Sequence, residues 1–413
     1  MRDGFWLLLF SKFARLSRIY APMPLRLGCV GMLFVGITRA VYSQPPELSS
    51  QMALPEPSGR FPVGRVNFDW IDESRIDPLS PQAGTKRELT VWIWYPASTN
   101  RTSTPSDYIP AYWRAALAKR QPPDANKVWR DPSFVHCHSF DNVEIAKAQS
   151  TWPVVLMKPG VGSPALDYTT LCEDLASHGY IVVASDSPYN TYLVVHKDGR
   201  AVGVNSAASP RGTNATRILE IWSADNRFLL DRLTALNKHD PDNRFEGRLD
   251  MTKVGVMGHS FGGATAAEFC HEDSRCKAGI DLEGQPFGEV INTGINRPFM
   301  FLLADHLAIR SAEDQQIVDK IKSIYEHSAP GRQYVTLRDS GHFNFSDKCL
   351  LFVGPIPRRS DTIGNIDTRR GLTVAAACVT TFFDVHLKGA EASSIDRLFS
   401  KYTELVVGPD NHK

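Results

Sequence analysis

From residue 152 onward, short runs of apolar residues alternate with longer segments in which apolar residues recur every three to four positions. Near-continuous apolar runs are typical of strands buried on both faces, whereas the longer pattern is typical of amphipathic helices. Strands separated by helices form a mostly parallel sheet, because parallel neighbours need a crossover connection. We therefore predict an α/β fold with a doubly wound, mostly parallel sheet and helices on both faces.

The pattern also gives approximate bounds for these elements. The expected strands are ELTVWIWYPA (88–97), WPVVLMKPG (152–160), YIVVASDSP (180–188), KVGVMGHS (253–260), KAGIDLEG (277–284), RPFMFLLAD (297–305) and QYVTLRDSG (333–341). The expected helices are 167–179, 217–237, 261–270, 311–329 and 373–389. We expect one domain over residues 63–405, with no internal repeat.

The amino-terminal part of the chain has a different character. Residues 1–43 carry six basic residues and one acidic residue, and they include a twelve-residue apolar run, LGCVGMLFVGIT. This run is too short to span a bilayer but has the length of a signal-peptide core, so we expect a secreted protein, with a retained membrane anchor as the alternative. Residues 44–62 are rich in Pro and Ser and predict a disordered stem. Insertions are expected near 101–150, with a helix over YIPAYWRAALAKR, and near 188–213.

Composition narrows the classes of function. The 413 residues are 42% hydrophobic and carry 46 Lys and Arg against 45 Asp and Glu, a net charge of +1. Such a balance gives no field that would draw the chain onto nucleic acid, so we exclude that class of partner. An ester of a small molecule or a lipid remains as the partner, with peripheral contact to a lipid surface left open, and the sequence does not indicate an oligomeric state.

The cysteines and glycosylation triplets fit an oxidising compartment. Cys270 and Cys276 bracket the short loop in FCHEDSRC and are the first candidates for a disulfide. The cysteines that remain outside the apolar run are either further disulfides or buried thiols: Cys137, Cys172, Cys349 and Cys378. Asn100, Asn214 and Asn344 each begin an N-x-S/T sequon.

One short stretch carries the strongest chemical signal. GHSFG, residues 258–262, has the form G-x-S-x-G and lies between the apolar run KVGVM and the helix-forming ATAAEF. A serine in this context stands on a tight strand-to-helix turn, with its hydroxyl exposed above the sheet. We predict that Ser260 is a nucleophile.

A serine hydroxyl needs a general base within hydrogen-bond reach. Among the histidines that follow Ser260, His342 is the best placed, because VTLRDSGHFNF sets it in a small-residue loop directly after the last apolar strand. His386 lies within a helical pattern, and His271 and His327 lie near helix ends. We predict that His342 is the base.

A carboxylate should orient that base, and it should fall between the serine and the histidine along the chain. Asp281 ends the strand after Ser260, and Asp305 ends the next strand. Glu283 and Asp339 are lower-ranked candidates. The residues alone do not choose between Asp281 and Asp305.

The developing oxyanion needs backbone N–H groups that are already in place. One comes from Phe261, directly after the serine. The other is expected from the loop PGVGS, where Val161 is the preferred donor and Pro159 has no N–H. The chemistry requires no cofactor and no metal, and the HCH triplet at 136–138 is too isolated to indicate a metal site.

Together these residues resemble the plasma-type platelet-activating-factor acetylhydrolase family, which comprises serine esterases of the α/β-hydrolase superfamily. The resemblance rests on LTVWIWYPA, LASHGYIVVASD, GHSFGGAT, GIDLEG and GHFNFSD, and extends over about residues 65–390. It implies an α/β-hydrolase fold and an acid at a position that matches Asp281, ahead of Asp305. Many members have a histidine before the oxyanion-loop glycine, where this chain has KPGVG.

The resemblance thus implies a secreted serine ester hydrolase with Ser260, His342 and Asp281 as its triad, which would remove short sn-2 acyl groups from phospholipids of the platelet-activating-factor type. A rival substrate is a lactone, polyester or other non-phospholipid ester. A catalytically silent hydrolase fold used for binding is the alternative outside enzymes. The insertions are expected to shape the acyl or leaving-group pocket.

Overall fold

The computed structural model describes residues 51–99, 104–120, 129–210, 212, 214–305, 312–353 and 362–409. The chain divides into two compact units, residues 1–44 and 45–413, and the described residues all belong to the second. The expected signal segment lies outside them. Within the described part, none of the helices is long and apolar enough to cross a membrane.

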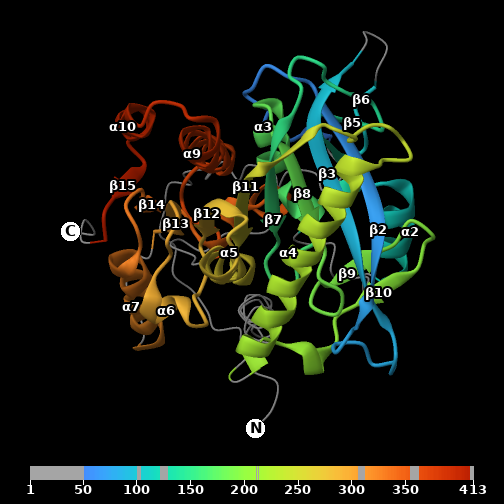
Figure 1. Cartoon of the computed structure of the whole chain (residues 1–413), viewed down its shortest axis with the longest axis horizontal. Helices are drawn as coiled ribbons and strands as arrows, with labels where there is room; N and C mark the ends of the chain where they lie inside the picture. Colours follow the sequence, from blue (N-terminus) through green and yellow to red (C-terminus); the bar gives the residue numbers. More distant parts are fainter. Residues whose placement is uncertain are drawn as a thin grey trace, which may run out of the picture. The chain divides into compact units, whose positions relative to one another are not determined.

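Eleven strands of the described residues form one sheet, coloured from blue to red along the chain in Figure 1. From one edge to the other they are β15 (Leu405–Val407), β14 (Gln333–Leu337), β13 (Phe299–Ala304), β12 (Cys276–Leu282), β11 (Leu249–His259), β7 (Trp152–Lys158), β8 (Ile181–Ser185), β3 (Lys86–Ser98), β2 (Val63–Ile76) and β5 (Ser139–Asp141), with β6 (Glu144–Ile145) paired to β3. The run from β14 to β8 is parallel, whereas β15 is antiparallel to β14 and β3 is antiparallel to both β8 and β2. All seven expected strands are present, and the predicted mostly parallel α/β fold is confirmed.

Alternation along the central strands produces two cores, one on each face of the sheet. In β7, Val155 and Met157 belong to one apolar cluster, and Val154 and Leu156 belong to the other. The first cluster lies under α3 (Thr169–Ser177), α9 (Thr368–Lys388) and α10 (Ser393–Lys401). The second lies under α4 (Asn214–Lys238), α5 (Phe261–Glu272), α6 (Val290–Thr293) and α7 (Ala312–His327). Helices therefore cover both faces, as strands buried on both sides require.

The expected stem differs from the structure over residues 51–62. Met52 and Ala53 form β1, which pairs with β4 (Val135–His136), and the next residue, Leu54, is fully buried. The main chain of Gly59 and Phe61 donates hydrogen bonds to Ser177 on α3. Contacts with distant segments thus order a stretch whose composition alone predicts disorder, and the folded unit begins before residue 63.

The two insertions add elements at one side of the sheet. The helix expected near residue 108 is α2 (Ala111–Arg120), and it is anchored by the buried side chains of Trp113 and Leu117. The same insertion supplies β4, β5 and β6, which pair with β1, β2 and β3. The second insertion folds as a hairpin of β9 (Leu193–Val195) and β10 (Ala201–Gly203).

The cysteines confirm one expected pairing. Cys270 and Cys276 form a disulfide that closes the loop between α5 and β12. The other candidates are buried thiols: Cys137, Cys172, Cys349 and Cys378. The sequon at Asn344 is not a glycosylation site in the folded chain, because this side chain is fully buried and its Oδ1 accepts hydrogen bonds from two backbone amides. Asn100 lies outside the described residues.

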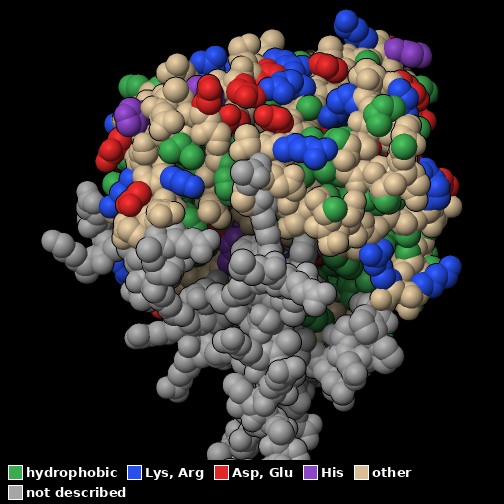
Figure 2. Space-filling model, turned by 90° about the horizontal axis from the view of Figure 1, so that it is seen from below, with side chains coloured by type: hydrophobic (Ala, Val, Ile, Leu, Met, Phe, Trp, Pro, Cys, Tyr) green, Lys and Arg blue, Asp and Glu red, His purple; other side chains and the backbone are tan. Residues whose placement is uncertain are grey.

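Charges of both signs are mixed on the surface. Figure 2 shows basic and acidic side chains interspersed over the described part of one face. This mixture agrees with the near-zero net charge of the sequence. On that face the described charges of opposite sign offset one another locally, so this face presents no extended region of one charge that would attract a charged ligand.

Candidate active site

The candidate residues follow consecutive strands of the sheet. Strands β7, β11, β12, β13 and β14 are neighbours in this order, so the loops at their carboxyl ends form a row. This edge is where open α/β sheets bind ligands (Figure 1). Along the row lie Val161, Ser260, Glu283, Asp305 and His342, each within a few residues of a strand end. The fold therefore gathers the predicted groups at one edge.

Ser260 occupies a strained turn between β11 and α5. Its backbone has φ 58° and ψ −125°, a conformation that side-chain-bearing residues rarely adopt. A Cβ at Gly258 would overlap the Gly262 carbonyl, and a Cβ at Gly262 would overlap the carbonyls of Lys158 and Pro159. The Ser260 N–H donates to Leu282 O at 2.9 Å, which ties the turn to the neighbouring strand. The predicted strand-to-helix turn is thus formed because glycine on either side permits it.

His342 begins the short 3-10 helix η5 (His342–Phe345) after β14, and its side chain is 31% exposed. Its Nδ1 lies 3.9 Å from Oε1 of Glu283, whose side chain is 8% exposed. The other carboxylate oxygen of Glu283 accepts a hydrogen bond from Ala304 N at 2.6 Å. One oxygen is thus held by the backbone while the other lies near the imidazole, beyond hydrogen-bond distance but close enough for its charge to favour the protonated ring.

Asp281, the acid that the resemblance implies, lies near the end of β12 as expected. It is fully buried in β12, and its carboxylate packs against Gly263 and Gly284, where a Cβ on either glycine would overlap it. Neither oxygen has a hydrogen-bond partner of normal geometry among the described residues. Burial raises the pKa of Asp281 well above its usual range, the charge of Glu283 raises it further, and the nearby Gly284 amide lowers it only in part. This environment disfavours the charged form of Asp281, whereas the carboxylate of Glu283 lies 3.9 Å from His342 Nδ1.

Asp305 and Asp339 serve the loop that carries the histidine. The Asp305 Oδ2 accepts a hydrogen bond from Asp339 N at 2.7 Å, and Asp305 N donates to Ser340 O at 3.3 Å. Asp339 itself has a φ of 58°, in the left-handed region that a turn requires. Asp305 thus holds the turn before His342 through the main chain.

The oxyanion loop after β7 leaves a single amide unused. Gly160 N donates to Tyr168 Oη, Gly162 N to Asn190 O and Ser163 N to Gly160 O. The N–H of Val161 makes no hydrogen bond with the described residues, and the N–H of Phe261 is one of the unpaired amides that begin α5. These are the two predicted oxyanion donors. They lie at neighbouring strand ends on either side of Ser260.

An apolar wall adjoins these two donors. Buried members of this cluster include Leu79, Trp222 and Phe261, and Val161, Tyr189 and Phe287 pack against it while partly exposed. The Phe261 ring packs edge-on against Trp222 at 4.9 Å and lies 5.6 Å from Phe287. We call Val161, Tyr189, Phe261 and Phe287 the apolar wall. Tyr189 comes from the 188–213 insertion, which therefore contributes to this apolar cluster.

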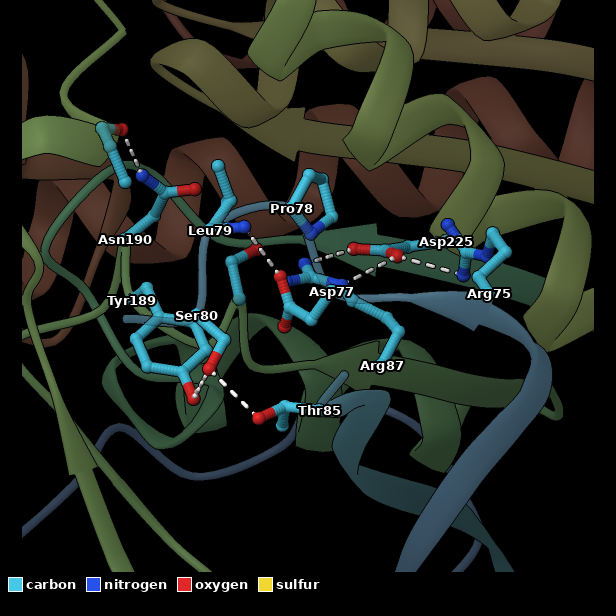
Figure 3. A network of polar contacts seen from close by, with 12 residues as sticks. Arg75, Asp77, Pro78, Leu79, Ser80, Thr85, Arg87, Tyr189, Asn190 and Asp225 are labelled. Carbon is cyan, nitrogen blue, oxygen red and sulfur yellow. Dashed lines mark hydrogen bonds and ion pairs between the residues drawn. The ribbon is translucent and has the colours of Figure 1, made fainter. Parts of the chain in front are cut away.

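A polar network that includes Arg87 and Asp225 contacts Leu79 and Tyr189 of this apolar cluster (Figure 3). Arg87 bridges Asp77 and Asp225, with Nη1 at 2.9 Å and Nη2 at 2.6 Å from their carboxylates. Asp77 in turn accepts from Leu79 N, and the Tyr189 hydroxyl donates to Ser80 Oγ at 3.1 Å. The turn between β2 and β3 is thereby tied to α4 and to the insertion (Figure 3).

Lys158 ends β7, directly before the oxyanion loop. Its side chain is fully buried, with Nζ 3.7 Å from Asp225 Oδ2, 3.3 Å from Ser185 Oγ and 4.9 Å from the Trp222 ring. Burial lowers its pKa to about 8, against the opposing charge of Asp225. Lys158 therefore belongs to the same polar network.

The raised pKa of Asp281 predicts how the melting temperature should change with pH. A carboxyl with a raised pKa in the folded state contributes stability that is present below about pH 4 and is lost as the pH rises through the folded pKa. Asparagine cannot ionise, so the melting temperature of Asp281→Asn minus that of the wild type should increase as the pH is raised from 4 to 8. Thermal melts at several pH values measure this. A constant difference would show that Asp281 titrates normally.

Comparison with known proteins gives the fold and site a family. A family model described as platelet-activating factor acetylhydrolase, isoform II, matches residues 47–203 and 231–404. The chain belongs to this family. It is 24% identical over 400 residues to a probable 1-alkyl-2-acetylglycerophosphocholine esterase of Arthroderma benhamiae, which covers 90% of this chain and 96% of the relative.

Two further matches place it among ester hydrolases. It is 25% identical to the platelet-activating factor acetylhydrolase of Cavia porcellus, over 64% of this chain and 63% of that enzyme. The solved structure of a ferulic acid esterase from Streptomyces cinnamoneus superposes with a TM-score of 0.73 at 29% identity, over 87% of this chain and 99% of the other. This member of the acetylhydrolase family is therefore a carboxylic ester hydrolase with an α/β-hydrolase fold. The family match is interrupted at residues 204–230. The unmatched segment includes much of α4, which carries Trp222.

Proposed function

We propose that this protein hydrolyses its ester through an acyl-enzyme on Ser260. The observation that carries the proposal is that one row of strand ends bears a serine on a strained turn, an imidazole with a carboxylate nearby and two unused amides. Serine esterases need these groups together. Ser260, Glu283 and His342 follow one another along the chain in the order that this fold requires.

The reaction follows from these positions. The Ser260 Oγ attacks the ester carbonyl carbon while His342 accepts the hydroxyl proton, and Glu283 stabilises the imidazolium that forms. The carbonyl oxygen becomes an oxyanion that the amides of Phe261 and Val161 stabilise. His342 then donates the proton to the alkoxy oxygen as the bond to the acyl carbon breaks. Water repeats the sequence, and the acid leaves Ser260.

The proposed substrate is a phospholipid with a short sn-2 acyl group. The names of the fungal and mammalian relatives support it, and so does the alignment over 96% of the fungal protein. The apolar run at residues 27–38 supports secretion. The N-terminus of the purified extracellular protein, read by mass spectrometry, tests that address: a start near residue 44 is expected, and an intact residue 1 would contradict it.

A second candidate substrate is an aryl ester, such as a hydroxycinnamate. Two observations favour it. The ferulic acid esterase aligns over 99% of its length, and the wall beside the oxyanion donors is built from aromatic rings that offer edge and face contacts to another ring.

The substrate is tested by measuring kcat/KM on a matched series. The series contains p-nitrophenyl esters from acetyl to palmitoyl, a phosphatidylcholine with an sn-2 acetyl group, the same lipid with sn-2 palmitoyl, and methyl ferulate. We expect a maximum at acetyl and a rate for the sn-2 acetyl lipid about 100-fold above its palmitoyl control, the discrimination that a small acyl pocket provides. Hydrolysis of methyl ferulate with an untouched phospholipid would instead establish the aryl ester.

A further inference from the structure

We propose that Tyr168 and His259 are positioning residues, which couple the oxyanion loop to the main chain of His342 through one buried hydrogen-bond chain. The inference rests on the proposed function of Ser260 and His342. It assigns a role to the residue directly before the nucleophile and to a tyrosine that lies far from it in sequence.

The chain of contacts has three links. Gly160 N, in the oxyanion loop, donates to Tyr168 Oη at 3.1 Å. The Tyr168 hydroxyl lies 2.8 Å from His259 Nδ1, and His259 Nε2 lies 2.8 Å from the carbonyl oxygen of His342. Both distances are normal for hydrogen bonds, so the chain is continuous from the oxyanion loop to the residue that supplies the base.

The acceptors fix the direction of each link. The His342 carbonyl can only accept, so His259 Nε2 must carry the proton. Desolvation by burial lowers the pKa of His259 well below its usual range, and the neighbouring His342 ring lowers it further, so the ring is neutral and its Nδ1 is an acceptor. Burial raises the pKa of Tyr168, so its hydroxyl keeps the proton that Nδ1 accepts. Tyr168 Oη is then left as the acceptor for Gly160 N.

Both side chains are held rigidly. Tyr168 and His259 are almost completely buried, and their rings lie 5.6 Å apart. The His259 ring also lies 4.6 Å from that of His342. On its other side, a Cβ at Gly160 would lie 3.1 Å from His259 Nδ1 and 3.1 Å from Ser260 Cβ, so this position must stay small. The imidazole of His259 thus fills the space between the oxyanion loop and the base.

Geometry makes this chain relevant to the reaction. His259 is covalently next to Ser260, and its Nε2 holds the main chain of His342, so one ring sets the separation of nucleophile and base. Lys348, which follows η5, links the segment that begins with His342 to the oxyanion loop and the residues after it. Its Nζ lies 2.7 Å from Ser163 Oγ and 3.3 Å from Asp167 Oδ2. A displacement of about 1 Å between such groups can lower a rate by about 100-fold.

The test compares variants that keep or remove the links. His259→Gln retains one donor and one acceptor at similar spacing, whereas His259→Leu removes both. Tyr168→Phe removes the phenol alone. Tyr180→Phe is the matched control, because Tyr180 is equally buried and its hydroxyl donates to Asp384 at 2.8 Å, away from the row of strand ends.

We expect a split between kcat and KM on p-nitrophenyl acetate. His259→Leu and Tyr168→Phe should lower kcat by about 100-fold and about 30-fold with KM within about threefold of the wild type, as misplacement of a reacting group does. His259→Gln should keep kcat within about tenfold. Tyr180→Phe should lower the melting temperature and leave kcat unchanged. Equal losses in His259→Gln and His259→Leu, or a wild-type kcat in His259→Leu, would overturn the proposal.

A readout without turnover separates this proposal from the proposed function. In the Ser260→Ala variant, the imidazole ¹⁵N chemical shifts of His259 should report a neutral ring with the proton on Nε2. In the double variant that also carries Tyr168→Phe, this tautomer should be lost. A proton on Nδ1 overturns the hydrogen-bond chain even in an active enzyme. A wild type that hydrolyses no ester removes the proposed function, and the positioning role with it.

Discussion

The Ser260→Ala variant is expected to lose about 10⁵-fold to 10⁶-fold in kcat on any ester that the wild type hydrolyses, as removal of a triad nucleophile does in other serine hydrolases. The methyl side chain cannot form an acyl-enzyme. Direct attack by water, aided by the oxyanion amides, would account for the remaining rate. Folding should survive, because the strained φ of 58° is set by the surrounding glycines and by the bond from Ser260 N to Leu282 O, neither of which the substitution touches.

The measurement combines steady-state rates with labelling by a fluorophosphonate, which reacts with activated serines. The wild type should be labelled on the peptide that contains Ser260, and the variant should not be. Ser400→Ala is the matched control, since Ser400 lies on α10 and its hydroxyl only donates to Asp396 O. Wild-type turnover in Ser260→Ala would refute the nucleophile, and labelling of a second serine would show where the reaction occurs.

Sequence reasoning named Ser260 and His342 as candidates for nucleophile and base because each has a local signature. Ser260 lies between glycines that a tight turn requires, and the turn is formed as predicted. His342 follows the last parallel strand in a loop of small residues. Near-continuous apolar runs likewise predicted that helices cover both faces of the sheet, because strands buried on two sides are apolar at almost every position.

The proximity of Glu283 to His342 could not be predicted in the same way. Asp281 and Glu283 have the same parity in β12, so both would point to the same face if the strand simply continued. The strand ends at Leu282, however, and Glu283 adopts a φ of 56°. That turn carries its carboxylate towards His342 and leaves Asp281 inside. In the sequence, only Gly284, directly after Glu283, indicates a turn. The alternation of apolar and polar residues does not predict a glutamate with a backbone in the left-handed region.

Non-local contacts account for the other difference. Residues 51–62 have the composition of a linker, yet Leu54 is buried and the main chain near Gly59 bonds to Ser177, more than a hundred residues away. Composition reports how much apolar surface a segment carries. It does not report whether the rest of the domain offers that segment a groove, and here α3 and β4 do.

The Glu283→Gln variant is expected to lower kcat by about 10³-fold to 10⁴-fold, with little change in KM, because an amide cannot stabilise the His342 imidazolium that forms in the transition state. Glutamine has the same shape and can still accept the hydrogen bond from Ala304 N, which holds the carboxylate now at 2.6 Å. The loss should therefore reflect the missing charge rather than a misfolded loop.

Asp281→Asn and Asp305→Asn are the matched controls, and together with Glu283→Gln they rank the three carboxylates. Asp281→Asn replaces a buried carboxyl, whose pKa burial raises, with an amide of the same shape, so kcat should stay within about tenfold of the wild type. Asp305→Asn keeps an acceptor for Asp339 N and should do the same. Rates with p-nitrophenyl acetate across pH 5–9 decide the matter. If Asp281→Asn loses more than Glu283→Gln, the buried aspartate must ionise and reach His342 during turnover, and the strand end would have to rearrange around Gly284 to let it do so.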